Sequence, residues 1–348
     1  MKYLLAAALV ILIAAFALTN LSPVGKSMNG LAVAKASSSF VRNAYNENTG
    51  YFELKYSCFF DTKACAPSTD LNEPPHSGYA MMSLKEVGRH TSDTELQALA
   101  DSILDKAIER CASDARYCEW NFFPLHAFYT ETKDKKYLDA MLSVVDTVMR
   151  ERPVKEVVDA NIPVKWWRLY ESTGEKKYLD RVVKIADEEL ASKSLHALGP
   201  ILYTSNGQDI AVYDVPSIWA LFMPAYFASD EERFLDNSIA TLEAAALEKH
   251  LDAYNTLPLT SNYVKGIEAT LWVAEADASR KDAYRAKAVA ALQQLLEERW
   301  DTPKRPLFNG DYGFLVATTT KATNVQGWIT FLLTKLADEQ FSEPAARE

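Results

Sequence analysis

Acidic and amide side chains recur just before strongly apolar segments of this 348-residue chain, and aromatic side chains stand beside them. Clear examples are "CEWNFFP" (118–124), "VVDANIP" (157–163) and "GQDIAVYDVPS" (207–217). Carboxylates and amides hydrogen-bond sugar hydroxyls, and aromatic rings stack on the apolar face of a sugar. Two carboxylates roughly 5–10 Å apart can also hydrolyse a glycosidic bond by acid/base catalysis. These segments therefore predict a carbohydrate site, provided that the fold gathers them.

We expect Asp159 and Glu119 to be the catalytic pair, because they precede neighbouring apolar segments. Substrate contacts are expected from polar and aromatic residues in the same and similar stretches: Trp120, Asn121, Asn161, Asp209, Tyr213, Asp214, Trp219, Asn262, Tyr263, Asp311, Gln326, Trp328 and His76. Each polar residue in this set has an alternative role as an ordinary helix N-cap. The aromatic residues have an alternative role in the core. Metal-ligand spacing, phosphate loops and dinucleotide motifs are missing from the sequence, so neither a metal nor an organic cofactor is predicted.

The elements that must position these residues are repeated. Residues 128–146 and 169–187 align with "DKKYLD" over "EKKYLD", and 226–243 is a looser copy with Phe234 in place of the tyrosines. A period of about 40 residues indicates a repeated pair of helices. Apolar residues at three- and four-residue spacing support helices throughout.

Grouping the helical segments predicts five hairpins and a lone helix: 77–89 with 94–111, 119–131 with 135–151, 159–172 with 176–193, 214–228 with 231–249, 262–276 with 281–299, and 324–339. The segment 38–47 can supply a twelfth helix that closes a ring. The first helix of each pair is interpreted as the more apolar one, as expected for an inner helix buried on all sides. The sequence thus predicts an all-α toroid with short β-like pieces in its rim loops, and an open α-solenoid is the competing architecture.

The connections are asymmetric. Turns within a hairpin are short, whereas links between hairpins are longer, notably 194–213 and 300–323. If the inner helices run parallel, all long links fall at one end of the ring, beside the N-terminal ends of the inner helices. Because loops of variable length on a regular scaffold commonly carry function, we expect the site at this end.

The stretch "VVDANIPVKWWRLYESTGEKKYLDRVVKIADE" resembles the unsaturated glucuronyl hydrolases, a family of six-hairpin (α/α)6 toroids. The resemblance implies that Asp159 is the general acid/base that such enzymes use on an unsaturated uronic acid. That family has a second aspartate before the preceding inner helix, where this chain has "EWNFF". Only Glu119 or Asn121 can replace that aspartate. Of the family's cluster on the next inner helix, only Trp219 has a counterpart.

The N-terminal residues 1–20 are apolar after one lysine and predict a signal peptide or a membrane anchor, and hence export to the outer side of the membrane. Residues 21–37 are expected to form a flexible linker, 38–341 a single toroid domain, and 342–348 a disordered tail. Cys58, Cys65, Cys111 and Cys118 suit an oxidising compartment, and the two local pairings 58–65 and 111–118 are the simplest of three possibilities.

A net charge of −10 argues against nucleic-acid binding, which needs a concentrated positive face. The leading hypothesis is an exported glycoside hydrolase that acts on an oligo- or polysaccharide with acid/base carboxylates. A non-catalytic toroid or solenoid that binds glycan or protein at the cell surface is the alternative, and lyase or epimerase chemistry is a lesser one.

Overall fold

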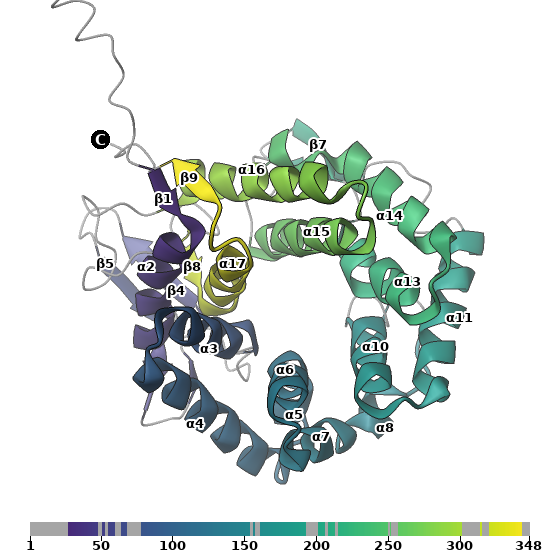
Figure 1. The fold of residues 1–348 in the computed structure, drawn as a ribbon, viewed down its shortest axis with the longest axis horizontal. Helices are drawn as coiled ribbons and strands as arrows, with labels where there is room; N and C mark the ends of the chain where they lie inside the picture. Colours follow the sequence, from purple (N-terminus) through teal and green to yellow (C-terminus); the bar gives the residue numbers. More distant parts are fainter. Residues whose placement is uncertain are drawn as a thin grey trace, which may run out of the picture.

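The chain forms a closed ring of helices with short strands at its edge, in the computed structural model shown in Figure 1. The structure describes residues 27–47, 51–52, 55–59, 64–67, 78–153, 156, 161–192, 201–205, 208–212, 215–249, 251, 257–300, 314 and 320–342. All structural statements below concern these residues.

The inner layer of the ring consists of helices that follow one another around the axis (Figure 1). They are α3 (Gly78–Thr91), α6 (Phe122–Thr132), α10 (Ile162–Thr173), the continuous run of α12 (Val215–Ser217), η1 (Ile218–Phe222) and α13 (Met223–Ser229), α15 (Leu257–Ala276), and α17 (Thr323–Lys335). The outer layer consists of α4 (Thr94–Cys111), α7 (Lys135–Leu142), α11 (Lys176–Ser192), α14 (Glu232–Ala245), α16 (Lys281–Arg299) and α2 (Gly30–Asn43). Shorter helices are α5 (Arg116–Trp120), α8 (Val145–Val148) and η2 (Leu247–Lys249). The toroid predicted from the sequence is confirmed, with inner and outer helices paired as expected.

The two ends of the chain close the ring. Helix α2 packs on α17 and α3, and α17 also packs directly on α3. Strand β1 (Ser27–Asn29) pairs with β9 (Gln340–Ser342) in antiparallel register. An open solenoid is therefore excluded. The boundary at residue 38 was wrong, because residues 27–37, which we expected to be a flexible linker, form β1 and the first half of α2. Their buried side chains, among them Val33 and Ala34, explain why they are ordered against the ring.

The short strands lie at the rim. They are β2 (Tyr45–Asn46), β3 (Tyr51–Phe52), β4 (Lys55–Phe59), β5 (Ala64–Pro67), β6 (Ile201–Ser205), β7 (Gln208–Val212) and β8 (Thr320–Ala322). Strand β4 pairs with both β5 and β8, and β6 pairs with β7. Cys58 and Cys65 are partners in the β4–β5 register. Cys111 and Cys118 form a disulfide that joins α4 to α5, as predicted.

The repeated hexapeptide marks the short turn between an inner and an outer helix. Lys133, Gly174 and Asp230 end α6, α10 and α13 in the left-handed conformation. One residue earlier, the Thr132 and Thr173 hydroxyls each accept a hydrogen bond from the backbone two residues on, 3.1 and 3.2 Å away. The same combination of a left-handed residue and a preceding hydroxyl therefore recurs in the sequence, because each of these hairpins reverses direction in the same way.

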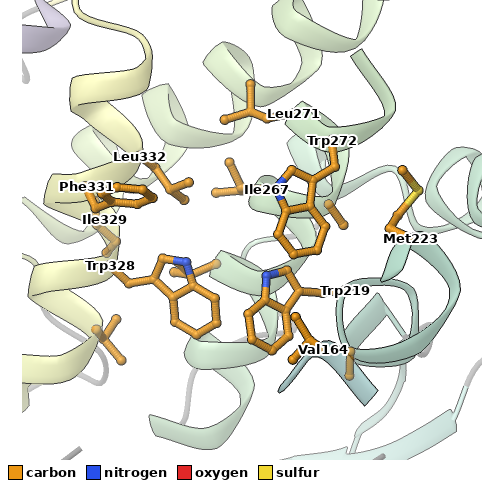
Figure 2. Close-up of a cluster of buried hydrophobic side chains, with 14 of the residues drawn as sticks. Val164, Trp219, Met223, Ile267, Leu271, Trp272, Trp328, Ile329, Phe331 and Leu332 are labelled. Carbon is orange, nitrogen blue, oxygen red and sulfur yellow. The ribbon is translucent and has the colours of Figure 1, made fainter. Parts of the chain in front are cut away.

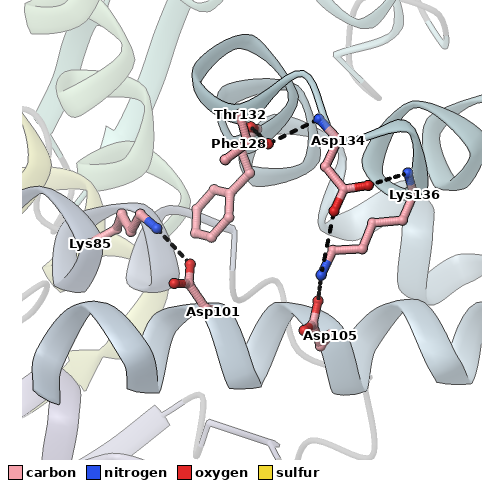
Figure 3. Close-up of polar contacts among 7 residues, drawn as sticks. All are labelled: Lys85, Asp101, Asp105, Phe128, Thr132, Asp134 and Lys136. Atoms are coloured by element: carbon pink, nitrogen blue, oxygen red, sulfur yellow. Dashed lines mark hydrogen bonds and ion pairs between the residues drawn. The ribbon is translucent and has the colours of Figure 1, made fainter. Parts of the chain in front are cut away.

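Several outer helices then bury an aromatic side chain in the first turn. Tyr137, Tyr178 and Phe234 occupy this position in α7, α11 and α14, and all three belong to the core. Polar contacts fix the same region from outside. Figure 3 shows Asp134 capping the Lys136 amide, with the Lys136 ammonium 2.7 Å from Asp105 of α4. The repeat therefore combines a turn signal with an anchor for the outer layer.

No helix among these residues is long and apolar enough to cross a membrane. The apolar segment 1–20, predicted to be a leader or anchor, lies outside the described residues, as does most of the tail 342–348.

Replacing Gly327 with alanine is expected to destabilise the ring. A Cβ at this position would lie 2.5 Å from the Cα of Ala80, where α17 and α3 close the toroid. Overpacking of this kind costs about 1–3 kcal/mol, which urea unfolding would measure. Gly174→Asn is the control, because a Cβ there meets no atom within 4 Å and asparagine tolerates the left-handed conformation. Equal stabilities of Gly327→Ala and the unaltered protein would contradict the tight α17–α3 contact.

Peptide mapping without reduction should recover a Cys58–Cys65 linkage beside the Cys111–Cys118 linkage. The β4–β5 register places Cys58 and Cys65 opposite each other, the arrangement that a cross-strand disulfide needs. Recovery of Cys58 or Cys65 as a free thiol from protein secreted into an oxidising compartment would refute this pairing.

Candidate functional site

A buried carboxylate, Glu268 of α15, lies where the inner helices converge. Its Oε2 accepts hydrogen bonds from Tyr79 Oη at 2.9 Å, from Trp219 Nε1 at 2.7 Å and from Trp328 Nε1 at 2.8 Å. These donors come from α3, η1 and α17. No donor among the described residues hydrogen-bonds the other oxygen, Oε1. One side chain therefore links four inner elements across the axis.

Burial dominates the electrostatics of this cluster. It raises the pKa of Glu268, although the three hydrogen bonds and the Arg168 guanidinium act in the opposite direction. The pKa of Tyr79 is raised well above its usual value, first by burial and then by the Glu268 charge. Tyr79 thus stays a donor, and Glu268 can hold a proton to higher pH than an exposed glutamate.

Aromatic rings surround Glu268 in one layer. Tyr79 stacks on Trp328 with ring centroids 4.2 Å apart, and Trp219 stacks on Trp272 at 5.8 Å. Phe123 adds an edge contact to Trp219 at 5.5 Å. Figure 2 shows Trp219, Trp272 and Trp328 converging from different inner helices. This layer, which we call the aromatic plug (Tyr79, Phe123, Trp219, Trp272 and Trp328 around Glu268), fills the axis.

A cavity of about 650 Å³ extends from the plug to the end of the ring where the short turns lie. Its outer wall includes Arg89, Glu131, Glu275 and Lys335, which stand near the C-terminal ends of their inner helices. Glu268 also lines the cavity. We call this space the short-turn cavity. It opens at the end opposite to the one that we expected to carry the site.

Polar side chains of α6 and α10 face the short-turn cavity. Arg168 Nη1 donates to Glu171 Oε2 at 2.8 Å, and the Arg168 guanidinium lies 3.8 Å from the Trp167 ring centroid. His126 Nε2 is 3.3 Å from Glu171 Oε2. Burial, and then the Arg168 charge, lower the pKa of His126 well below its usual value, so this imidazole is neutral at pH 7.

At the opposite end, beside the long links, the structure brings two predicted residues onto α10. Glu119 of α5 lies 3.1 Å from Lys165 Nζ, and Asn161, which precedes α10, accepts a hydrogen bond from Lys265 Nζ at 2.9 Å. Asn161 and Lys165 are four residues apart and so share one face of the helix start. Lys265 also lies over the Trp219 ring at 5.4 Å. We call this group the long-link cluster.

Lys165 is the more deeply buried member of its pair. Burial lowers the pKa of Lys165, and the Glu119 carboxylate opposes that shift. The ion pair, with Nζ and Oε1 3.1 Å apart, joins α5 to the first turn of α10.

Other predicted residues have structural contacts. Tyr263 is fully buried and its hydroxyl contacts Ala291 O and Gln294 of the outer helix α16, at 3.1 and 3.2 Å. Gln326 is buried and bonds the backbone N–H and C=O of Phe314. Both side chains turn away from the axis, so the prediction that they contact substrate is corrected. Their patterns mimicked site residues because they stand near the starts of inner helices.

Several remaining candidates keep their predicted status. Asn121 is buried and donates to Tyr117 O at 2.7 Å, Trp120 contacts the Tyr117 ring, and Asn262 is partly buried on α15. Outside the described residues, or with undescribed side chains, are His76, Asp159, Asp209, Tyr213, Asp214 and Asp311. The structure thus unites Trp219 with Trp328, and Glu119 and Asn161 with lysines of inner helices. It leaves the Asp159 side chain untested.

Sequence reasoning missed Glu268, Arg168 and Trp272. Glu268 lies mid-helix, far from the loop segments on which the search concentrated. A signal was available, since "KGIEATLWVAE" places a single acid among apolar residues of a helix expected to be buried on all sides. His126 is buried and also lines the cavity. No group of three metal-ligand side chains gathers in the described part of the chain.

The sequence matches no family model, and no curated protein sequence matches it. Solved structures do share the fold. The α-1,6-mannanase GH76A of Salegentibacter sp. HEL1_6 aligns with a TM-score of 0.62 and 12% identity, covering 89% of this chain and 99% of that one. The unsaturated glucuronyl hydrolase from Streptcoccus agalactiae gives 0.57 and 14%, covering 91% and 94%. The glycoside hydrolase family 76 mannosidase Bt3792 from Bacteroides thetaiotaomicron gives 0.59 and 15%, covering 88% and 98%. The chain therefore has the (α/α)6 toroid fold of these glycoside hydrolases.

Replacing Glu268 with glutamine should remove a pH-dependent part of the stability. In the unfolded chain the carboxyl ionises near its ordinary value of 4.5, whereas in the fold its pKa is raised. Its contribution to the free energy of unfolding is therefore full below about pH 4.5 and is lost as pH rises through the folded-state pKa. Urea unfolding across this range should show the stability of the unaltered protein, relative to Glu268→Gln, falling and then levelling off. A difference that grows with pH would show that the hydrogen bonds outweigh burial.

Proposed function

We propose that this protein is an exported glycoside hydrolase that cleaves an oligo- or polysaccharide at the long-link end of the toroid. The shared fold supports this proposal, because the similar structures are named as mannanases, a mannosidase and unsaturated glucuronyl hydrolases. The Cys111–Cys118 disulfide supports export, since such bonds persist in oxidising compartments. The apolar N-terminal segment is consistent with secretion or with a tether at the outer face of the membrane.

The observation that carries the proposal is the Glu119–Lys165 pair at the start of α10. Asp159 is two residues before Asn161, whose side chain receives the Lys265 ammonium at the same end. Glu119 thus contacts the first turn of the helix that Asp159 precedes in the sequence. We infer that the two carboxylates act on one glycosidic bond, as a two-carboxylate mechanism requires.

The two acids take different roles in this proposal. Glu119, which lies 3.1 Å from Lys165 Nζ, acts as the base that activates water or as the nucleophile that attacks the sugar. Asp159 is then the acid that protonates the leaving oxygen. Trp120, Asn121 and Asn161, with Asp209, Tyr213, Asp214 and Asp311 of the long links and His76, would surround the sugar with hydrogen-bonding groups and stacking faces.

A second candidate is a non-catalytic glycan- or protein-binding toroid. The Glu119–Lys165 ion pair is also compatible with this second candidate, because buried Lys165 needs a partner of opposite charge and Glu119 supplies it. In that case Glu119 has a structural role and no catalytic one. Catalysis and binding without turnover are separated by the same experiment.

Glu119→Gln and Asp159→Asn should each lower the rate of sugar release by about 10²–10⁴-fold, the typical contribution of a general acid or base. Substrates would be α-1,6-linked manno-oligosaccharides and unsaturated glucuronyl disaccharides, followed by reducing-end release and by loss of the double-bond absorbance. Glu109→Gln makes the same chemical change at an exposed position of the outer helix α4, outside the Glu119–Lys165 pair, and should keep full activity.

Binding of these sugars without turnover by the unaltered protein would decide for the binding toroid. Full activity in both Glu119→Gln and Asp159→Asn would reject the assignment of the catalytic pair. Thermal unfolding of each variant shows whether a loss of activity reflects a loss of fold.

A further inference from the structure

We propose that the short-turn cavity is a second ligand site, which binds one neutral sugar ring against Glu268. This site is separate from the proposed hydrolytic site, and the inference does not depend on hydrolysis. The argument starts from Glu268, whose side chain is almost fully buried and yet lines the cavity.

Glu268 has an acceptor left over for a ligand. The donors Tyr79, Trp219 and Trp328 all meet Oε2, and none among the described residues meets Oε1. Because Glu268 lines the cavity, its Oε1 can accept a hydrogen bond from a ligand hydroxyl. The plug also fixes the carboxylate from three directions, so its position is set before any ligand arrives.

The size and the walls of the cavity suit a sugar. Its volume of about 650 Å³ falls within the range of small-molecule pockets. Trp167, Phe227, Trp272 and Phe331 line it with flat apolar surface. Such surfaces stack on the apolar face of a pyranose, while Glu268 and Arg168 offer an acceptor and a donor for its hydroxyls.

The charges argue against an ionic ligand. A cationic ligand would seek the aromatic wall, but the Arg168 guanidinium already lies 3.8 Å from the Trp167 ring centroid and 6.0 Å from that of Trp272. An anionic ligand would meet five acidic side chains in the lining, which outnumber the four basic ones, Lys85, Arg89, Arg168 and Lys335. A neutral ring with both donors and acceptors matches Arg168 and Glu268 together.

The test measures binding of D-mannose, D-glucose and N-acetyl-D-glucosamine to the full chain, by saturation-transfer NMR and tryptophan fluorescence. At least one of these sugars should bind, and Glu268→Gln should weaken it by about tenfold or more. The three donors hold the glutamine oxygen at the plug, so its amide N–H₂ would face the cavity and an acceptor would become a donor. Glu109→Gln is the matched control and should bind as the unaltered protein does.

A second variant guards against loss of fold in Glu268→Gln. Ala127 of α6 is partly buried in the cavity wall, and Ala127→Phe fills cavity space without replacing a residue of the plug. It should also abolish binding, whereas a sugar held at the long-link end would survive both changes. Failure of all three sugars to bind, affinity unchanged in both variants, or Glu268-dependent binding of tetramethylammonium instead would overturn the proposal. If Asp159→Asn abolishes hydrolysis but leaves sugar binding in the cavity unchanged, the cavity site and the hydrolytic site are distinct.

Discussion

The interior of this toroid depends on one acceptor placed where several donors meet. Trp219 and Trp328 can only donate through their indole N–H groups, and a buried donor without an acceptor is costly. Glu268 Oε2 satisfies both indoles and the Tyr79 hydroxyl at 2.7–2.9 Å. The dependence is mutual, because a carboxylate buried this deeply also needs those donors. Four inner helical elements are therefore fixed relative to one another by a group that none of them could bury alone.

This constraint divides the axis of the ring into two ends with different chemistry. The long-link cluster holds Glu119 beside a buried lysine, and the short-turn cavity presents an oxygen of Glu268 to solvent-accessible space. Trp219 belongs to both ends, since it lies under Lys265 and stacks on Trp272. Trp219 thus connects the long-link cluster to the aromatic plug, and a change in its position would alter its contacts with both Lys265 and Trp272.

The layout of the hairpins could be predicted from the sequence because it depends on interactions between residues that are close in the chain. A left-handed residue such as Gly174, a hydroxyl such as Thr173 and a buried aromatic such as Tyr178 recur with each turn, and such signals act within a few residues of the chain. Glu268 could not be identified in that way. Its role depends on donors 49 to 189 residues away, which only the closed ring brings together. The same limit explains Tyr263 and Gln326, since their position near a helix start says nothing about whether they face the axis or the outer layer.

The location of the short-turn cavity shows that loop length alone does not predict where a cavity forms. The expectation of a site beside the long links considered only connections, whereas the cavity is produced by the side chains along the inner helices. Large rings fill the axis at the plug, but nearer the short turns the inward positions include Arg89, Glu131, Glu275 and Lys335. Charged groups of this kind must keep contact with water, so they cannot close the interior as the aromatic rings do. A ring with aromatic residues at one level of its axis and charged residues at another must therefore stay hollow at the charged level, whatever the lengths of its loops.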